Sequence, residues 1–515
     1  MKKSVIVLVC IAFISILLSG CSKGSSAGED PSKGKPPEGF NKSGFPIVDK
    51  PVTMTMFADR SAANGPYKDM SMFQAYEKKT NIKVKFNDVP DVSFAEKKSL
   101  VFGSKNLPDI FFKANISPLE TVKYGTNGVL IPLEGLIKKY APNIEGLFEK
   151  YPETKKALTA PDGHIYTLSD IVTLLSARTN KIWLNQTMLK GVNMKEPKTT
   201  DELYTVLKAF KEKYPKNTPL SASSIGDLIN GFGGAWGLTQ QMGYNINVNN
   251  DKVHIWTADD EYKELLTYLH KLYQENLLDH EVPTHTYAQY VAKMQSGKVG
   301  LFFNQASDAF PQVADQYAGI APLKGPEGEQ KYTAGPITRS FGEFAITSTN
   351  KNPEAAIRWI DYFYGDEGSI FFRYGVEGKT FNYTKDGVPE YTDDVLKSSK
   401  GIGAMTPWPG GGSPELINEK NSTAINPPEV QKAADKIQPY ISKQIYAAPL
   451  FDADTATKVN DLKNDIDTYV NEATAKFITG DRSLDTWDKY VSELKKMGLD
   501  KLEKYYQDAY DKQYK

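Results

Sequence analysis

The chain has 515 residues, of which 62 are basic and 63 acidic, so its formal net charge is −1. This balance lacks the basic excess of proteins that bind nucleic acid or anionic membrane surfaces, so we expect no nucleic-acid partner. The only cysteines are Cys10 and Cys21. Stability must therefore come from a hydrophobic core, which a chain of this length can divide among two or more domains.

The first element along the chain is an export signal. Lys2 and Lys3 precede an apolar run over 5–18 that is short for a membrane helix, and the sequence continues as Leu-Ser-Gly-Cys at 18–21. This string looks like a bacterial lipobox, in which the sulfur of Cys21 receives a diacylglyceryl group. We predict a signal peptide over 1–20, lipidation of Cys21 and anchoring to the extracytoplasmic face of the cell membrane. The alternatives are a secretory peptide with an accidental cysteine and a single membrane span.

A polar segment follows the signal. Residues 22–39 are rich in Ser, Gly, Lys and Pro and nearly free of apolar side chains. Such a composition cannot bury a core, so we expect a flexible tether over 21–45. Loss of Lys2 and Lys3 with the signal leaves 60 basic against 63 acidic residues, a net charge of −3. Because Cys10 leaves with the signal and Cys21 is lipidated, no disulfide is expected.

Strand and helix patterns alternate after the tether. Runs rich in β-formers at 52–57 and 82–86 flank a segment with helical spacing at 70–79, which predicts a β-α-β opening. Later strands are predicted at 108–112, 299–303 and 343–347. Helices are predicted to begin at Ser117, Thr199, Asn352 and Ser483. The helix from Thr199 should end before Pro215, and the helical segment from Ser483 should break at Gly498.

Several short motifs follow one another along the whole chain. After the lipobox come Asn-Leu-Pro-Asp-Ile at 106–110, Leu-Glu-Gly-Leu-Ile at 133–137, Asp-Gly-His-Ile-Tyr at 162–166, Asn-Lys-Ile-Trp-Leu at 180–184, Gly-Glu-Phe-Ala-Ile-Thr at 342–347 and Tyr-Gly-Val-Glu-Gly at 374–378. None is specific alone. In this order they resemble the large sugar-binding lipoproteins of bacterial ABC importers, in extracellular solute-binding protein family 1.

The resemblance implies a two-lobed, periplasmic-binding-protein-like (type II) α/β fold, with a mixed, mostly parallel sheet in each lobe. By this analogy the first lobe comprises 46–170 and 300–347, and the second 171–299 and 348–515 with the C-terminal helices. The chain would cross between the lobes near 169–174, 297–304 and 347–350.

The resemblance also implies a function. The protein would capture a sugar or oligosaccharide by hinge closure, without chemistry on it, and deliver it to the membrane subunits of an ABC importer. It would act as a monomer without a cofactor. The alternatives are a binder of another solute, such as a peptide or a compatible solute, and a surface lipoprotein that degrades glycans.

A cleft that closes on a sugar needs polar groups for hydroxyls, and open α/β sheets bind ligands beyond the ends of their strands. The polar residues near predicted strand ends are Asp59, Arg60, Asp109, Asn304, Gln305 and Arg339. Each is a candidate ligand-binding residue. The alternatives are structural: Asp59 caps a helix, Arg60 is a surface charge, and Asn304 satisfies turn backbone.

Aromatic faces can stack on the C–H patches of a sugar ring. Trp236 and Trp408 lie in glycine-rich loops with little side-chain cover, so either indole is a candidate stacking platform. Their alternative role is to anchor the loop to the core. Trp183, Trp359 and Trp487 lie in patterns that favour core packing.

Enzyme and metal motifs fail on spacing. The stretch at 280–285 resembles HExxH, but its two histidines are five residues apart and Pro283 would break a helix, so it predicts a loop. No CxxC, GxSxG or P-loop lysine is present, and we predict no catalytic residue. The segment 211–219 has one carboxylate and three lysines, so we predict no calcium loop and no metal site there.

Overall fold

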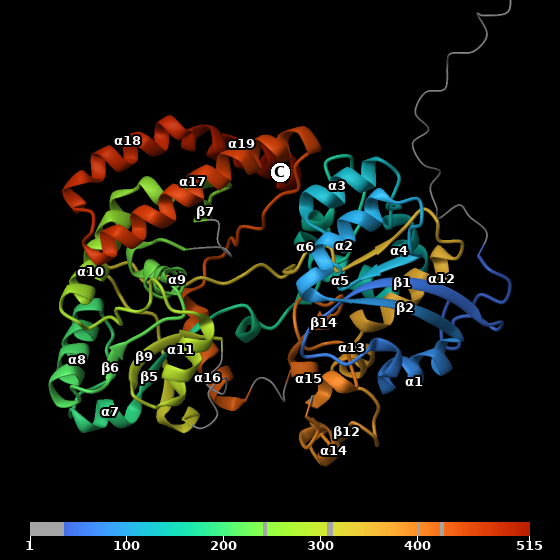
Figure 1. Ribbon diagram of the computed structural model, residues 1–515, viewed down its shortest axis with the longest axis horizontal. Coiled ribbons are helices and arrows are strands. Elements are labelled where there is room, and N and C mark those ends of the chain that lie inside the picture. Colours follow the sequence, from blue (N-terminus) through green and yellow to red (C-terminus); the bar gives the residue numbers. More distant parts are fainter. Residues whose placement is uncertain (1–35, 240–244, 306–312, 400, 423–426) are drawn as a thin grey trace, which may run out of the picture.

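The computed structural model describes residues 36–239, 245–305, 313–399, 401–422 and 427–515. The predicted signal peptide and Cys21 lie outside these residues. The described chain forms two lobes side by side, and the C-terminal helices run across both (Figure 1). Each lobe has its own hydrophobic cores, which contain separate sets of residues.

The first lobe is built on a four-stranded sheet in the order β11-β3-β1-β2. Its strands are β1 (Val52–Arg60), β2 (Ile82–Pro90), β3 (Ile110–Phe112) and β11 (Phe344–Ile346). β1 pairs in parallel with β2 and β3, whereas β11 runs antiparallel to β3. Alternate residues of β1 enter opposite cores, with Met54 and Met56 on one face and Phe57 on the other, so helices cover both faces.

The helices of the first lobe come from two stretches of the chain. They are α1 (Ser71–Thr80), α2 (Asp91–Gly103), α3 (Pro118–Thr126), α4 (Glu134–Tyr140), α5 (Pro142–Lys150), α6 (Pro152–Leu158), α12 (Pro353–Asp361), α13 (Asp366–Tyr374), α14 (Asp393–Leu396) and α15 (Glu419–Ser422). The N-cap predicted at Ser117 is confirmed: its Oγ accepts from Glu120 N, and the Glu120 carboxylate accepts from Ser117 N.

The second lobe has a sheet in the order β10-β5-β9-β6. Its strands are β5 (Lys181–Asn185), β6 (Thr218–Leu220), β9 (Val299–Asn304) and β10 (Tyr317–Ile320). β9 runs parallel to β6, and β5 runs antiparallel to both β9 and β10. A hairpin of β7 (Ile246–Asn249) and β8 (Lys252–Ile255) lies outside this sheet.

Helices surround the second sheet. They are α7 (Gln186–Gly191), α8 (Thr200–Lys213), α9 (Ile225–Phe232), α10 (Asp260–Gln274), α11 (Tyr287–Gln295), α16 (Pro428–Ile437), α17 (Ala453–Thr479), α18 (Trp487–Met497) and α19 (Leu499–Tyr514). α8 begins after Thr199, whose hydroxyl accepts from Glu202 N, and ends before Pro215 as predicted. Gly498 separates α18 from α19 in the left-handed conformation, at φ 98°.

Two of the expected lobe boundaries are wrong. The segment 300–347 was expected in the first lobe, but β9 and β10 pair with β5 of the second lobe and only β11 joins the first. The segment from 348 was expected in the second lobe, but α12 packs its apolar face, including Ile357 and Ile360, into the first. β4 (Ile171–Val172) pairs with β14 (Leu416–Ile417), and β5 of the second-lobe sheet follows it along the chain.

The expected tether ends earlier than residue 45. Within the described residues 36–45, the Phe40 ring packs edge-on against Tyr140, with centroids 5.3 Å apart. Phe45 packs in the same way on Tyr362, and the Gly44 carbonyl accepts from Arg358 Nη2 at 2.6 Å. These aromatic side chains bind the segment to the first lobe, so the flexible-tether prediction is wrong for 36–45.

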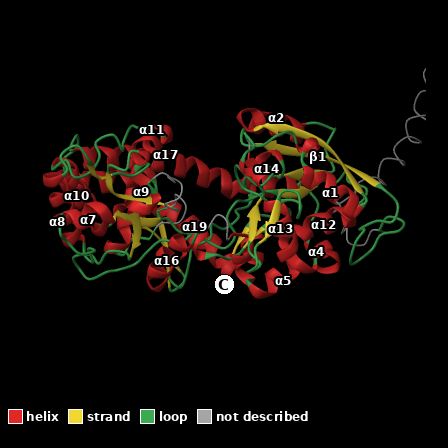
Figure 2. Ribbon diagram, turned by 90° about the horizontal axis from the view of Figure 1, so that it is seen from below, coloured by secondary structure: helices red, strands yellow, loops and turns green. Residues whose placement is uncertain are grey.

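The C-terminal helices connect the lobes. α17 contacts α10 in the second lobe and α3 in the first, and α19 contacts α6. Figure 2 shows α17 extending between the lobes. Lys156 Nζ donates to the Tyr514 carbonyl at 2.9 Å across this junction. Within the described ranges, no helix combines the length and apolar character needed to cross a membrane.

Candidate functional site

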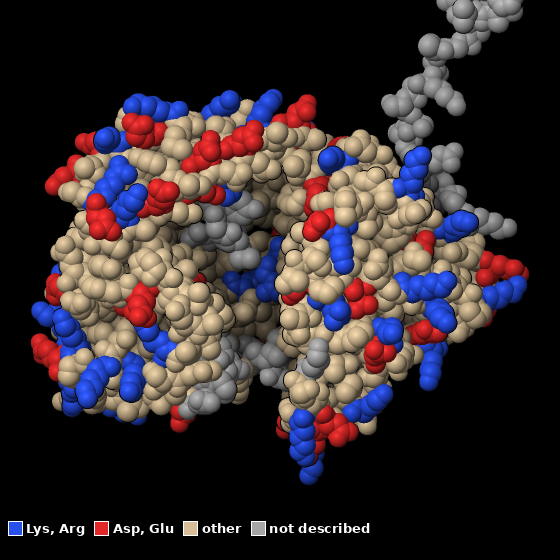
Figure 3. All heavy atoms as spheres, viewed as in Figure 1, with Lys and Arg blue, Asp and Glu red and all other residues tan. Residues whose placement is uncertain are grey.

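A hollow separates the two lobes, and Lys and Arg atoms are visible inside it (Figure 3). Part of it is a pocket of about 380 Å³, here called the first-lobe pocket. It lies beyond the carboxyl ends of β1 and β3, where open sheets bind ligands. Its walls include Asp59 from the end of β1, Lys113 after β3, Glu343 before β11 and the loop 410–412. Tyr446, whose ring belongs to a second-lobe core, closes the other side.

Lys113 and Glu343 are buried ionisable residues in this pocket, with 3% and 2% of their surfaces exposed. Lys113 Nζ donates to the carbonyls of Pro407 at 2.5 Å and Gly410 at 2.9 Å, which fixes the loop above it. Burial lowers the pKa of Lys113 and raises the pKa of Glu343, and the attraction between the two groups opposes both shifts. A Cβ on Gly412 would lie 2.2 Å from Glu343 Oε1, so the loop approaches this closely because residue 412 is glycine.

A second cavity of about 210 Å³, here called the second-lobe pocket, lies at the hinge. It is lined by Arg178 before β5, Asn230 in α9, Gln305 after β9, and Tyr332. Arg339 lines both pockets, so the two are parts of one cleft.

The shared wall between the two pockets is held by an ion pair. Arg339 donates to one carboxylate oxygen of Asp170 from Nη2 at 2.7 Å and from Nε at 3.0 Å. The other oxygen of Asp170 accepts from Ser340 N at 2.6 Å. The Ala177 carbonyl accepts from Gln305 Nε2 at 2.6 Å and from Arg339 Nη1 at 3.4 Å. Arg339 is therefore positioned before any ligand arrives.

Six polar atoms that line the two pockets are shielded from solvent and have no hydrogen-bond partner among the described residues. They are Asp59 Oδ1, Thr338 Oγ1 and Glu343 Oε2 in the first-lobe pocket, and Arg178 Nε, Asn230 Oδ1 and Tyr332 OH in the second-lobe pocket. Buried polar atoms in folded proteins nearly always have partners, because an unpaired one costs about 1–3 kcal/mol. This concentration of unpaired donors and acceptors is the property of a site that a polar ligand completes.

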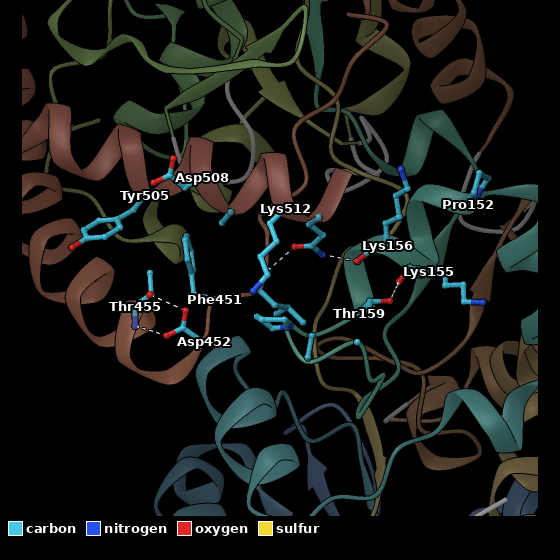
Figure 4. Close-up of a pocket in the computed structure, with 16 residues that line it drawn as sticks. Pro152, Lys155, Lys156, Thr159, Phe451, Asp452, Thr455, Tyr505, Asp508 and Lys512 are labelled. Carbon is cyan, nitrogen blue, oxygen red and sulfur yellow. Dashed lines mark hydrogen bonds between the residues drawn. The ribbon is translucent and has the colours of Figure 1, made fainter. Parts of the chain in front are cut away.

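A larger cavity of about 670 Å³ lies between α6 and the C-terminal helices (Figure 4). Its polar side chains bond within the protein: Asp452 accepts from Thr455, and Gln513 bonds to Leu450 N and the Lys156 carbonyl. Among the described residues of its lining, no side-chain nitrogen or oxygen is buried without a partner. We therefore assign it to the junction of the lobes and the interlobe cleft to ligand binding.

Three of the sequence-predicted polar residues line the cleft: Asp59, Gln305 and Arg339. The other three do not. Arg60 forms an ion pair with Asp88 at 2.8 Å. Asp109 lies at the amino end of β3, where its carboxylate accepts from Thr55 N and Oγ1 at 2.7 and 2.8 Å.

Asn304 has the structural role that was its alternative. Its Oδ1 accepts from Gln305 N at 2.6 Å, and its carbonyl accepts from Trp183 Nε1 at 3.1 Å. Asn304 therefore shapes the turn that carries Gln305 into the second-lobe pocket.

Neither predicted tryptophan platform lines either described pocket of the cleft. Trp236 is 6% exposed and packs against Tyr268, with ring centroids 5.4 Å apart. The glycines beside Trp236 permit close packing rather than exposure, since a Cβ on Gly234 would lie 1.9 Å from the Lys331 carbonyl oxygen. Trp408 is half-buried, with Arg373 over its ring at 5.0 Å. The core positions predicted for Trp183, Trp359 and Trp487 are confirmed.

Three residues that line the cleft are not among the sequence-predicted candidates: Lys113, Glu343 and Arg178. Lys113 follows the third strand at its carboxyl end, which is the argument that selected Asp59, so the same rule could have found it. Arg178 is one of only six arginines in the chain. Nothing local to Glu343 indicates its burial.

One acidic cluster outside the cleft already contains a cation. Asp279, Glu281 and His285 lie close enough to share a metal ion. Lys293 Nζ instead binds the carboxylates of Asp279 and Glu281 at 2.6 and 2.7 Å. The segment 280–285 contains turns and no helix, as its spacing predicted.

Comparison with known proteins places the chain among binding proteins. Residues 62–370 match the family of bacterial extracellular solute-binding proteins. The fructooligosaccharide ABC transporter substrate-binding protein FusA of Streptococcus pneumoniae is 27% identical over 485 residues, covering 88% of this chain and 89% of FusA. The polygalacturonan/rhamnogalacturonan-binding protein YtcQ of Bacillus subtilis is 24% identical, with 99% of each chain covered.

Solved structures show the same likeness. FusA in complex with kestose is 26% identical, with a TM-score of 0.72 over 89% of this chain and 99% of that one. An extracellular solute-binding protein from Bifidobacterium longum subsp. infantis has a TM-score of 0.78 at 23% identity, over 90% of this chain and 99% of that one. These likenesses confirm the two-lobed α/β fold predicted from the sequence.

Proposed function

Because the chain belongs to the family of bacterial extracellular solute-binding proteins, we propose that its interlobe cleft captures a sugar or oligosaccharide for an ABC importer. The observation that carries this proposal is the set of six unpartnered polar atoms that line the two pockets. Sugar hydroxyls both donate and accept, so one ligand can pair with carboxylate, hydroxyl, amide and guanidinium atoms together. The relatives FusA and YtcQ, whose names describe carbohydrate ligands, support the same ligand class.

The mechanism that we propose is hinge closure. The cleft is lined from both lobes, so a ligand that bridges them stabilises the closed arrangement, and the importer recognises that arrangement. The protein acts as a monomeric binder and performs no chemistry on the sugar.

We also propose that the protein works at the membrane surface. The lipobox-like sequence at 18–21 supports acylation of Cys21 and a position on the extracytoplasmic face. The B. subtilis protein named lipoprotein LipO, 26% identical over 361 residues that cover 65% of this chain and 68% of LipO, is consistent with such an anchor.

Thermal unfolding with a panel of ligands tests the proposal. A chain that begins at residue 22 would be heated with monosaccharides, oligosaccharides, peptides and compatible solutes. A ligand at a hundred times its Kd should add about 2.7 kcal/mol to the free energy of unfolding. We expect stabilisation by at least one carbohydrate and by no peptide.

Matched variants assign the effect to the cleft. Glu343→Gln should remove most of the stabilisation, because it replaces an acceptor oxygen of the first-lobe pocket with a donor. Asp508→Asn makes the same change in the larger cavity and should keep it. Stabilisation by peptides alone would contradict the sugar proposal. Release of reducing sugar from a glycan would show an enzyme instead.

A further inference from the structure

The second-lobe pocket contains an arginine that has no acidic partner in the cleft. The cleft-lining Arg339 is paired with Asp170, and two arginines elsewhere, Arg60 and Arg373, are paired with Asp88 and Glu415. Arg178 forms no ion pair within 4 Å among the described residues, and the lining of its pocket contains no Asp or Glu.

One edge of the Arg178 guanidinium is unused. Nη1 donates to the Gly335 carbonyl at 2.7 Å, which fixes the orientation of the group. Nε is buried without a partner, and no described atom accepts from Nη2. The Nε–Nη2 edge is one with which a guanidinium binds both oxygens of a carboxylate.

The described lining of the second-lobe pocket offers no acidic group to balance the charge of Arg178. Burial lowers the pKa of Arg178, and the opposing effects of Glu153 and Tyr151 are smaller. A partly buried charge without a counter-charge is costly, so an anionic group on the ligand would be favoured there. The remaining lining includes Asn180, Asn230, Gln305 and Tyr332, which are neutral and suit sugar hydroxyls.

We propose that the second-lobe pocket binds the carboxylate of an acidic oligosaccharide, with the Nε–Nη2 edge of Arg178 paired to both carboxylate oxygens. The ligand class is thus a uronic-acid-containing glycan. Asn230 Oδ1, which is buried without a partner, accepts from a hydroxyl of the same sugar. This inference rests on the proposed function and adds the charge of the ligand to it.

Pairs of ligands that differ only in the carboxylate test the inference. Trigalacturonate is compared by calorimetry with α-1,4-galactotriose, in which each carboxylate is replaced by CH₂OH, and oligomers of glucuronate and mannuronate are compared with their carboxyl-reduced forms. We expect one acidic member to bind at least tenfold more tightly than its neutral counterpart.

Variants connect the preference to one residue. Arg178→Gln should remove the difference between acidic and neutral forms, whereas Arg482→Gln, which removes the same charge from the second lobe outside both pockets, should keep it. If Arg178→Gln does not fold, Arg178→Lys keeps the charge without the fork and should reduce the preference.

The outcomes separate the two proposals. Neutral glycans that bind as tightly as the acidic ones, or a preference that survives Arg178→Gln, would overturn the inference and leave sugar capture in place. If no carbohydrate of the thermal panel binds, sugar capture is overturned, and the inference with it.

Discussion

The two pockets of the cleft differ in how their charges are balanced. In the first-lobe pocket, Asp59 and Glu343 share the lining with Lys113, and the attraction between Lys113 and Glu343 limits the pKa shifts that burial causes in both. In the second-lobe pocket, Arg178 shares the lining with amides, hydroxyls and Arg339, whose charge is already paired with Asp170. The charges of the first-lobe pocket are balanced by other groups of the protein. In the second-lobe pocket, the charge of Arg178 is balanced by the proposed acidic ligand.

The pockets also differ in what holds their walls. Lys113 ties the loop 407–410 to the end of β3, entirely within the first lobe. Arg178 is tied to Gly335, and both lie in segments that cross between the lobes. We therefore expect hinge movement to change the shape of the second-lobe pocket more than that of the first-lobe pocket. From these differences between the two pockets, we expect the first-lobe pocket to position the sugar and the second-lobe pocket to select the charge of the sugar.

The largest expected effect comes from breaking charge balance in the first lobe. Arg373 donates to both oxygens of Glu415 at 3.0 and 3.1 Å, and Glu415 is 1% exposed. Arg373→Met leaves that carboxylate buried and unpaired, so denaturant unfolding should show a loss of about 3–5 kcal/mol. Arg178→Gln leaves no acid unpaired and should cost no more than about 1.5 kcal/mol.

A double variant controls for the loss of the arginine side chain itself. Arg373→Met combined with Glu415→Leu should recover most of the stability, because neither charge remains buried. Equal losses in Arg373→Met and Arg178→Gln would contradict the distinction between the two arginines.

A smaller effect is expected at the loop that covers the first-lobe pocket. Gly412→Ala places a Cβ 2.2 Å from Glu343 Oε1 and 2.6 Å from Ser340 Cβ, so the loop must move. Affinity for the best glycan of the thermal panel should fall about tenfold, or about 1.4 kcal/mol by calorimetry. Gly146→Ala in α5 meets open space and should leave affinity unchanged while adding up to about 1 kcal/mol of stability. Unchanged binding in Gly412→Ala would remove the loop from the site.

The smallest effect is expected at a cation that is paired with two carboxylates. It lies outside the cleft, in the same lobe as Arg178. His254 bonds to Asp259 at 2.8 Å and Glu503 at 2.9 Å, and these bonds raise its pKa to about 10. Because the folded-state pKa lies above the unfolded value of about 6.5, the contribution to stability is complete below pH 6.5 and is lost as pH rises through 10.

His254 is half-exposed, so solvent screening limits this contribution to less than about 1 kcal/mol. The stability difference between the wild-type chain and His254→Gln should be larger at pH 6 than at pH 10. The same difference at both pH values would show that the two carboxylates do not stabilise the imidazolium of His254.

Local patterns predicted the elements but not their lobes. The Ser117 cap, the α8 start at Thr199 and the Gly498 break depend on neighbours within a few residues, and all appear in the structure. The place of β9 depends on pairing with β5, where Lys181 faces Asn304 more than a hundred residues along the chain. Such long-range pairing leaves no local signal, which is why the segment 300–347 was assigned to the wrong lobe.

The site was predictable only in part for the same reason. Asp59, Gln305 and Arg339 follow from their positions near strand ends. Trp236 misled because glycines around an aromatic residue permit either exposure or close packing, and contact with the distant Lys331 backbone decides for packing.

Small-angle scattering of the mature chain, with and without the glycan that gives the largest thermal shift, tests capture between the lobes most directly. We expect saturation at one glycan per chain to lower the radius of gyration, because the ligand bridges the two pockets and closes the hinge. Tight binding with an unchanged radius of gyration would contradict this expectation.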